Sequence, residues 1–321
     1  MTHREDFAQL GQYLSDNIIG QSHLVNRLLI ALLADGHLLV EGAPGLAKTR
    51  AIKDLSRKIE GNFQRIQFTP DLLPSDITGT EIYRPEDGSF QFQHGPIFHN
   101  LILADEINRA PAKVQSALLE AMAERQVSVG KNTMALDELF LVMATQNPIE
   151  QEGTYPLPEA QLDRFLMHVK IDYPDVDAER QILKLVRAET IDPITQTKED
   201  DLVNQASIFA ARKEVAEIYM SGAVEEYIVQ FIIATRRPDN YSDDLRKWID
   251  YGASPRGTVS LDRCARAHAW LAGKDFVSPD DVQAIIHDVL RHRLLITYEA
   301  EAEGLTTDDI INELIRLVPV G

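Results

Sequence analysis

The 321-residue sequence contains a single cysteine, Cys264, which excludes a disulfide within the chain. We interpret this cysteine as a small buried apolar residue rather than a catalytic thiol. No apolar run approaches the ~20 residues that a membrane-spanning helix needs, and the N-terminal residues have no apolar signal region. We therefore expect a cytoplasmic protein that has no membrane partner.

Positive charge is also scarce in this chain. Its 32 lysines and arginines are outnumbered by 50 aspartates and glutamates, giving a formal net charge of −18 and a pI near 4.9. Because such a chain repels polyanions, we expect no nucleic-acid partner. Two short basic clusters, Arg236-Arg237 and Arg291-His292-Arg293, are expected to be solvated helix ends.

Short apolar segments alternate with helical patterns over the first half of the chain. Strands are predicted at residues 37–41, 65–68, 101–104, 139–144 and 167–171. This alternation is typical of a parallel sheet with helices on both faces. After the linker-like stretch Asp172-Tyr173-Pro174-Asp175 the pattern is helical, with Ser278-Pro279 as one capped helix start. We predict an α/β domain at residues 1–174 and a smaller all-α domain at residues 175–321.

Two stretches, at about residues 70–95 and 126–137, interrupt the alternation. Each contains apolar residues that alternate with polar ones around a turn, at Glu86-Asp87-Gly88 and at Gly130-Lys131-Asn132. We predict two hairpins inserted between core elements. Ordinary connecting loops are the alternative, but the length of both stretches favours functional surface loops.

A glycine-containing loop follows the predicted strand at 37–41 and precedes a helix. Its residues are Gly42, Ala43, Pro44, Gly45, Leu46, Ala47, Lys48 and Thr49, followed by Arg50. A loop in this position aims backbone N–H groups at a triphosphate, near the positive end of the helix dipole. Lys48 would neutralise phosphate charge, and the hydroxyl of Thr49 would hold Mg²⁺. The pattern G-x-x-x-x-G-K-[ST] is kept except at Ala47, where a small residue replaces glycine. The sequence therefore predicts that these nine residues bind ATP.

Two carboxylates, Asp105 and Glu106, directly follow the apolar strand at 101–104. Parallel sheets place ligands at the carboxyl ends of their strands. Asp105 is therefore predicted to bind nucleotide and Mg²⁺, and Glu106 to orient or deprotonate the attacking water. Capping of the next helix, near Pro111, is the alternative for this pair.

With these motifs in place, the sequence resembles the AAA+ superfamily and, within it, the MoxR family of ATPases. The resemblance extends from about residue 18 to about residue 270 and includes the Ala47 variant of the phosphate loop. The other matching stretches lie at residues 71–79, 105–111, 144–148, 158–165 and 252–257. The resemblance implies a Mg²⁺-dependent ATPase, built as an AAA+ P-loop α/β domain with a parallel sheet between helices and a smaller all-α lid.

The resemblance also implies roles for single residues. Asn147 resembles the sensor 1 residue that helps to position the water, and Arg164 resembles the arginine finger that reaches the ATP of the next subunit. Arg256 resembles sensor 2, although a helix-start arginine in a salt bridge is the alternative. Ile19 and Gly20 belong to a segment that resembles the one packing on adenine.

For Arg109 two roles stay open: action at the subunit boundary, and surface pairing, which is the commoner arrangement for such an arginine.

Family members usually form hexameric rings, so the resemblance implies a homo-oligomer. It further implies protein clients that are remodelled or matured, in some cases by metal insertion, a partner with a von Willebrand factor A domain, and hairpins that face the pore or the client. Two other functions are alternatives. A ring-shaped nucleic-acid motor is opposed by the acidic charge. A nucleotide-dependent switch or scaffold is opposed by the joint presence of Glu106, Asn147 and Arg164.

Overall fold

A computed structural model describes residues 2–86, 88–130, 132–148, 153–191 and 202–320 of the chain. Its contacts divide the chain into two compact units. The first unit comprises Met1–Leu29, His37–Leu157 and Val169–Ile208, and the second comprises Ile30–Gly36, Pro158–His168 and Phe209–Gly321. Each unit thus consists of three segments of the chain, whereas the sequence predicts a single domain boundary after residue 174. That boundary stays a prediction.

A five-stranded sheet with the order β2-β5-β8-β1-β9 forms the centre of the first unit. Its strands are β1 (Leu38–Glu41), β2 (Phe63–Gln67), β5 (Leu101–Asp105), β8 (Leu141–Gln146) and β9 (Met167–Lys170). The pairs β2–β5, β5–β8 and β8–β1 are parallel. The strands β5 and β8 are central, and each begins with four consecutive apolar residues that are buried, as expected for strands covered on both faces.

The predicted strands correspond to these five strands, with ends that differ by up to two residues. The largest shifts are in β2, which begins at Phe63, and in β8, which begins at Leu141. Leu139 and Phe140 are buried, but they lie in the loop before β8. An apolar run by itself does not show where hydrogen-bonded pairing begins.

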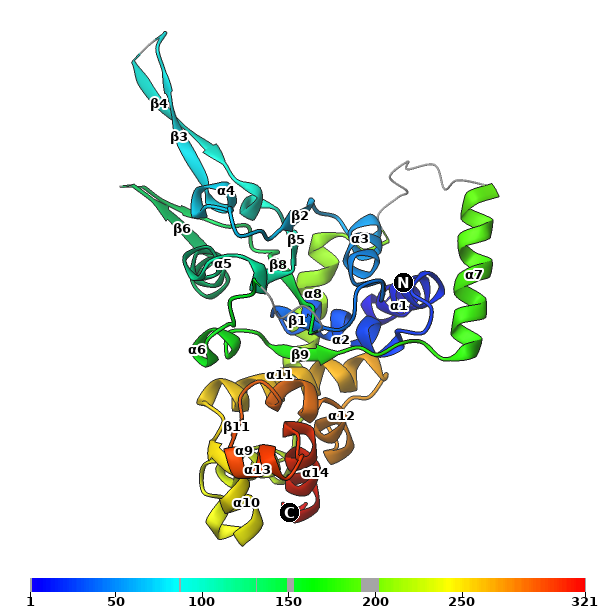
Figure 1. The fold of residues 1–321 in the computed structure, drawn as a ribbon. Helices are drawn as coiled ribbons and strands as arrows, with labels where there is room; N and C mark the ends of the chain where they lie inside the picture. The colour runs from blue at the N-terminus through cyan, green and yellow to red at the C-terminus, as the bar shows by residue number, and fades with distance from the viewer. Residues whose placement is uncertain (1, 87, 131, 149–152, 192–201, 321) are drawn as a thin grey trace. The chain divides into compact units, whose positions relative to one another are not determined.

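Helices of the first unit connect the strands, and several of them, such as α3, lie against the sheet (Figure 1). They are α1 (His3–Asn17), most of α2 (Ser22–Leu33), α3 (Lys48–Lys58), α4 (Pro74–Thr78), α5 (Ala112–Glu124) and α7 (Val176–Ile191), with the short 3-10 turns η1 (Pro96–Phe98) and η2 (Ile107–Arg109). Helix α1 begins with a capping box between Thr2 and Glu5, which satisfies N–H groups that a helix start leaves without partners.

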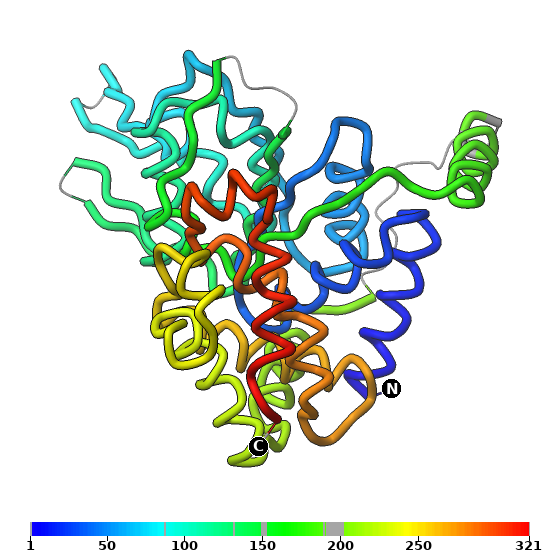
Figure 2. The backbone as a smooth tube through the Cα atoms, turned by 60° about the horizontal axis from the view of Figure 1, so that its bottom comes forward, coloured from blue at the N-terminus to red at the C-terminus, as the bar shows by residue number. Residues whose placement is uncertain are grey.

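Two antiparallel hairpins project from the first unit, in the two stretches where the sequence predicts them. One consists of β3 (Gly79–Arg84) and β4 (Ser89–His94), and the other of β6 (Gln126–Val129) and β7 (Asn132–Ala135). They lie side by side in both views (Figures 1 and 2), and Asn132 Nδ2 donates to Glu81 Oε1 at 3.3 Å. Asp87 and Lys131, at the predicted turns, lie outside the described residues.

The second unit is mainly helical. It contains α6 (Glu159–Leu162), most of α8 (Gln205–Glu217), α9 (Gly222–Arg236), η3 (Pro238–Asn240), α10 (Asp243–Trp248), α11 (Pro255–Leu271), α12 (Pro279–Leu290), α13 (Tyr298–Ala302) and α14 (Thr307–Leu317). The predicted helix start at Ser278-Pro279 is confirmed, with a capping box to Asp281. A two-stranded ribbon of β10 (Ile249–Tyr251) and β11 (Leu295–Ile296) is added to the expected helices. Strands of two or three residues are too short to give a sequence periodicity.

The two basic clusters have different environments. Arg236 and Arg237 are exposed, as predicted. The prediction for Arg291-His292-Arg293 is wrong, because His292 and Arg293 are buried and the Arg291 side chain is nearly so. These three side chains bind backbone carbonyls within the second unit, which compensates the loss of water.

Cys264 is buried, as expected. Among the described residues, no helix combines the length and apolar character needed to cross a membrane.

Candidate active site

The loop between β1 and α3 is shaped by two glycines for different reasons. A Cβ atom on Gly42 would lie 2.4 Å from Ile171 Cγ1 and 2.8 Å from its carbonyl oxygen, so no side chain fits there. Gly45 has φ +86° and no atom within 4 Å of a built Cβ. Packing therefore requires the first glycine, whereas backbone conformation favours the second, which faces open space.

Ala47, the residue that departs from the glycine pattern, lies at the N-cap of α3. It has the left-handed conformation, with φ 59° and ψ 15°, which costs an L-residue about 1 kcal/mol relative to glycine. No side chain caps this helix start. The first N–H groups of α3 therefore have no capping side chain and can bind an anion.

Lys48, the first residue of α3, turns back onto the loop. Its ammonium donates to the carbonyl oxygens of Gly42 at 2.6 Å and Gln146 at 3.3 Å. Burial lowers the pKa of the Lys48 amino group, while the nearby carboxylates of Asp105, Glu106 and Glu41 oppose that shift. The site thus holds a partly desolvated cation beside an acidic strand end.

Asp105, at the end of β5, is held at both of its oxygens. Thr145 donates to Oδ1 at 2.6 Å, and Arg65 donates to Oδ2 from Nη2 at 2.6 Å and from Nε at 3.1 Å. The Thr145 hydroxyl oxygen also accepts the Glu106 N–H at 2.9 Å, which fixes both acidic residues to β8. Arg65 and Thr145 were not among the residues selected from the sequence.

Glu106 has a left-handed backbone, with φ 56° and ψ 50°, so its side chain leaves the direction of the strand. Its Oε2 accepts from Gln67 Nε2 at 2.8 Å and lies 3.3 Å from Arg109 Nη1. Arg109 thus forms the surface pairing described above as the commoner arrangement. In this structure the carboxylate of Glu106 is held beside the pocket by neutral and cationic donors.

Two adjoining pockets lie on the phosphate loop. One, of about 340 Å³, is lined by residues 44–50 together with Asp105, Glu106 and Asn147. The other, of about 370 Å³, shares residues 44–47 and Arg50 with it and is otherwise mainly apolar, with Ile19, Tyr173, Pro174, Ile182 and Leu185 among its lining. A polar pocket and an apolar one that share the residues of one loop suit a phosphate chain joined to a flat base.

Gly20 makes the second pocket possible. It has φ +77°, and a Cβ there would lie 2.8 Å from Pro174 Cβ. Gln21 Nε2 also donates to the Asp172 carbonyl at 2.9 Å. These contacts join the segment before α2 to the segment before α7, a stretch that the sequence suggested only as a linker.

Most of the site residues predicted from the sequence lie together in the first unit. Ile19 lines the apolar pocket, Asp105, Glu106 and Asn147 line the polar one, and the loop from Pro44 to Arg50 contributes to one or both. Gly20, Gly42 and Ala43 line neither pocket but lie directly beside their walls. The contribution of Tyr173, Pro174 and α7 to the apolar pocket has no signal in the sequence, because only the fold brings that segment to the loop.

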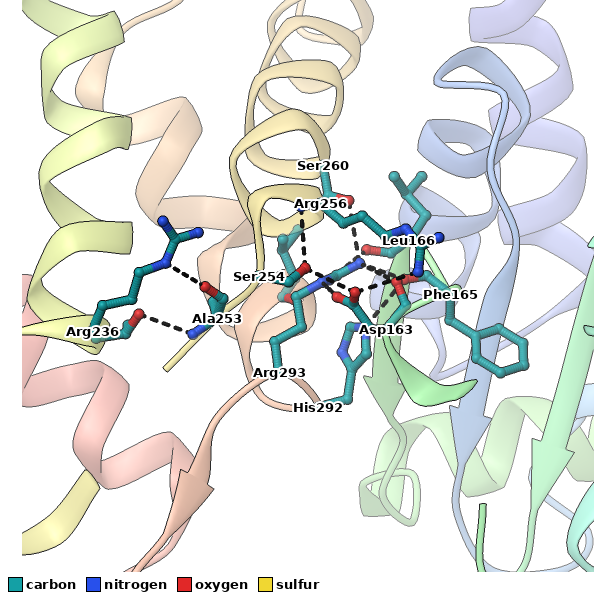
Figure 3. Close-up of polar contacts among 12 residues, drawn as sticks. Asp163, Phe165, Leu166, Arg236, Ala253, Ser254, Arg256, Ser260, His292 and Arg293 are labelled. Carbon is teal, nitrogen blue, oxygen red and sulfur yellow. Dashed lines mark hydrogen bonds and ion pairs between the residues drawn. The ribbon is translucent and has the colours of Figure 1, made fainter. Parts of the chain in front are cut away.

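Arg164 and Arg256 belong to the second unit and line neither pocket. There, Arg256 Nη1 lies 3.5 Å from Asp163 Oδ2, and its side chain is 56% exposed (Figure 3). The salt bridge given above as the alternative for Arg256 is therefore present. An exposed pair at this distance is weak and can exchange for a stronger anion.

Comparisons with known proteins agree with this architecture. A family model described as "ATPase family associated with various cellular activities (AAA)" matches residues 37–167, and an AAA lid domain model matches residues 246–314. Fold and matches together define an AAA ATPase with a lid.

Several relatives are similar over nearly the whole chain. The chain is 45% identical to Chaperone MoxR1 of Mycobacterium tuberculosis, covering 94% of this chain and 78% of that protein. It is 31% identical to Protein MoxR of Methylorubrum extorquens, covering 98% and 95%. The crystal structure of a candidate ATPase from Cytophaga hutchinsonii matches with a TM-score of 0.91 at 43% identity, covering 99% of this chain and 96% of that one. The chain belongs to the MoxR family of AAA+ ATPases.

Family membership establishes a nucleotide-binding ATPase, in a superfamily whose members usually assemble into rings.

Proposed function

We propose that this protein hydrolyses Mg²⁺-bound ATP at the two adjoining pockets of its first unit. The observation that carries the proposal is that a mainly apolar pocket and a polar one share residues of the phosphate loop, and that the polar one is lined by Lys48, Asp105, Glu106 and Asn147. The adenine fits the apolar part, beside Ile19, and the phosphates fit the part lined by the loop and the first turn of α3.

The residues of the polar pocket suit a magnesium ion. Thr49 and Asp105 both line it, and hydroxyl and carboxylate oxygens are the ligands that Mg²⁺ prefers. Mg²⁺, when bound, neutralises charge on the phosphate oxygens. Lys48 binds the phosphates, Asn147 orients the attacking water, and Glu106 accepts its proton. Gly20, Gly42, Ala43, Pro44, Gly45, Leu46, Ala47 and Arg50 shape the binding surface.

The remaining groups of the mechanism come from the second unit. We infer that the chain forms a homo-oligomeric, hexameric ring in which Arg164 reaches the ATP of the next subunit and stabilises charge in the transition state. Arg256 binds the phosphates as a sensor of nucleotide state, leaving its weak pair with Asp163.

ATP binding and hydrolysis are coupled to chaperone-like remodelling or maturation of protein clients. One relative carries the name Chaperone MoxR1, which supports this part of the proposal. The hairpin β3–β4 supports it too, because Tyr83 and Phe90 are exposed on it with ring centroids 5.3 Å apart. Exposed aromatic side chains of this kind bind apolar client segments. A partner with a von Willebrand factor A domain and client maturation by metal insertion are proposed from the family resemblance.

The test is steady-state ATP hydrolysis measured against protein concentration. We expect the rate per subunit to rise with concentration as rings assemble, and to fall by about 100-fold or more in Glu106→Gln, which keeps ATP binding. Arg164→Ala should bind ATP like the wild type and lose hydrolysis to a similar extent. Normal hydrolysis by Glu106→Gln would refute the assignment of the site, and normal hydrolysis by Arg164→Ala would refute the shared site.

A further inference from the structure

Three consecutive residues at the end of α12 hold the chain segment that contains Arg164. Arg293 donates from Nη2 to the Phe165 carbonyl at 2.6 Å and from Nη1 to the Leu166 carbonyl at 3.2 Å (Figure 3). His292 donates from Nε2 to the same Phe165 carbonyl at 3.1 Å, and Arg291 donates to the His168 carbonyl. The backbone directly after Arg164 is therefore held by the residues that follow α12 in the same unit.

The residue directly before Arg164 is fixed by the same guanidinium. Arg293 Nε donates to Asp163 Oδ1 at 2.9 Å, and the Arg293 side chain is only 1% exposed. Burial lowers the pKa of Arg293, and the Asp163 carboxylate opposes that shift. Without Asp163 the guanidinium would be a buried charge with no counter-ion, which is strongly unfavourable. The buried charge of Arg293 thus depends on Asp163.

The second oxygen of Asp163 joins a further element. Ser254, the N-cap of α11, donates from Oγ to Asp163 Oδ2 at 2.8 Å, and Arg256 of the same helix lies beside it (Figure 3). One carboxylate thus connects the Arg164 segment to the start of α11 and to the end of α12. This accounts for the assignment of Pro158–His168 to the helical unit, although the segment runs directly into β9 of the sheet.

We propose that Asp163 and Arg293 are positioning residues for Arg164, which fix the arginine finger to the helices of the lid. The inference rests on the proposed role of Arg164 in a shared site. A finger must meet the transferred phosphoryl group closely, and a displacement of about 1 Å can cost on the order of 100-fold in rate. Asp163, the chain neighbour of Arg164, also pairs with Arg256, so one carboxylate serves the anchoring of both arginines.

The first test compares Asp163→Asn with a matched control, Asp281→Asn. Asp281 is also a buried carboxylate of the second unit, paired with Lys274 and His268 at 2.8 Å. The polar partners of this carboxylate among the described residues are these two and Ser278, which lie outside the Arg164 segment. We expect Asp163→Asn to lower kcat about tenfold or more while ATP binds no more weakly than to the wild type. Asp281→Asn should keep kcat within about twofold. An equal loss of kcat in both variants would mean that lid stability alone matters, and would overturn the inference.

The second test is complementation in mixed rings. A Glu106→Gln subunit cannot hydrolyse ATP in its own pocket, but it offers an intact finger to its neighbour. Mixed with Asp163→Asn subunits, it should restore hydrolysis well above the sum of the separate rates, since one class of interface then has both an intact pocket and a well-placed finger. Arg293→Lys keeps the charge but loses the forked donor, and its hydrolysis should be restored in the same way. This variant replaces Asp163→Asn in the test if Asp163→Asn does not fold.

A reference mixture of Arg164→Ala with Glu106→Gln separates the possible failures. If this mixture recovers hydrolysis and the mixtures with folded Asp163→Asn or Arg293→Lys do not, the positioning role is refuted and the shared site stands. If the reference mixture does not recover, the proposed trans role of Arg164 fails, and the positioning role fails with it.

Discussion

Asp105 in the first unit and Asp163 in the second are held in nearly the same way. Each carboxylate accepts from a hydroxyl on one oxygen and from an arginine on the other: Thr145 and Arg65 at Asp105, Ser254 and Arg293 at Asp163. They differ in the exposure of the arginine, because the Arg65 side chain is 51% exposed and that of Arg293 is 1% exposed.

Burial therefore separates an exchangeable pair from a fixed one. Because the Arg65 side chain is half exposed, it can move into water when another cation takes its place on Asp105, as the proposed binding of Mg²⁺ requires. Arg293 cannot leave Asp163 without also losing backbone carbonyls that water cannot reach. The same kind of ion pair thus suits the proposed metal binding at Asp105 and the proposed positioning at Asp163.

The largest expected effect is on stability and compares Arg293→Met with Arg65→Met. Removing one partner of a buried pair costs about 3–5 kcal/mol, whereas an exposed pair contributes about 1 kcal/mol or less. Both tryptophans of the chain, Trp248 and Trp270, lie in the second unit, so tryptophan fluorescence follows the unfolding of that unit. Arg293→Met should lower the free energy of unfolding seen by this probe.

Calorimetry of Arg65→Met provides the matched measurement, because it also detects unfolding of the first unit. A loss of stability as large as that of Arg293→Met would remove the distinction between the two pairs.

The next largest effect is on how the stability of the second unit depends on pH. Burial, followed by the charges of Arg293 and His168, holds the pKa of His292 well below its usual 6.5. Below pH 6.5 the unfolded chain binds a proton that the folded one does not, so stability is lost as the pH falls, by up to about 1.4 kcal/mol per pH unit, until the folded pKa is reached.

Unfolding of the second unit in urea, followed by tryptophan fluorescence between pH 7.5 and 5, measures this loss. His292→Gln retains a donor for the Phe165 carbonyl, and its free energy of unfolding should fall less steeply as the pH is lowered. If it falls as steeply as in the wild type, groups other than His292 cause the effect.

The smallest effect concerns exchange at Asp105. If Arg65 competes with Mg²⁺ for this carboxylate, Arg65→Gln should lower the Mg²⁺ concentration that half-saturates ATP hydrolysis by about two- to fivefold, equivalent to about 1 kcal/mol or less. Arg316→Gln is the control, because Arg316 forms an exposed pair with Glu313 in α14 of the second unit and lines neither pocket. If Arg65→Gln needs the same Mg²⁺ concentration as the wild type, or a higher one, Arg65 does not compete with Mg²⁺ for Asp105.

The sequence predicts the parts of the site whose signal is local. The phosphate loop and the pair Asp105-Glu106 are recognisable because short runs of apolar residues fix their place at strand ends. Thr145 and Arg65 carry no such signal. They reach Asp105 only because β8 and β2 flank β5 in the sheet, and that neighbourhood is a property of strand order rather than of any single segment.

The basic cluster at residues 291–293 also shows that local sequence does not predict long-range contacts. Its sequence alone predicts a solvated helix end, because charged side chains normally stay in water. The backbone carbonyls of Phe165 and Leu166, about 130 residues away in the chain, make its burial possible. A long-range partner of this kind has no pattern near the residues that need it.

The sequence by itself determined the sheet strands, the nucleotide loop and the acidic pair, because periodicity and motif spacing act within one segment. Only the tertiary structure decided which side chains hold the carboxylates, how α7 closes the apolar pocket, and that the Arg164 segment belongs to the helical unit. These depend on desolvation and on pairing between distant segments, and the energy of a buried charge is fixed only when its partners are in place.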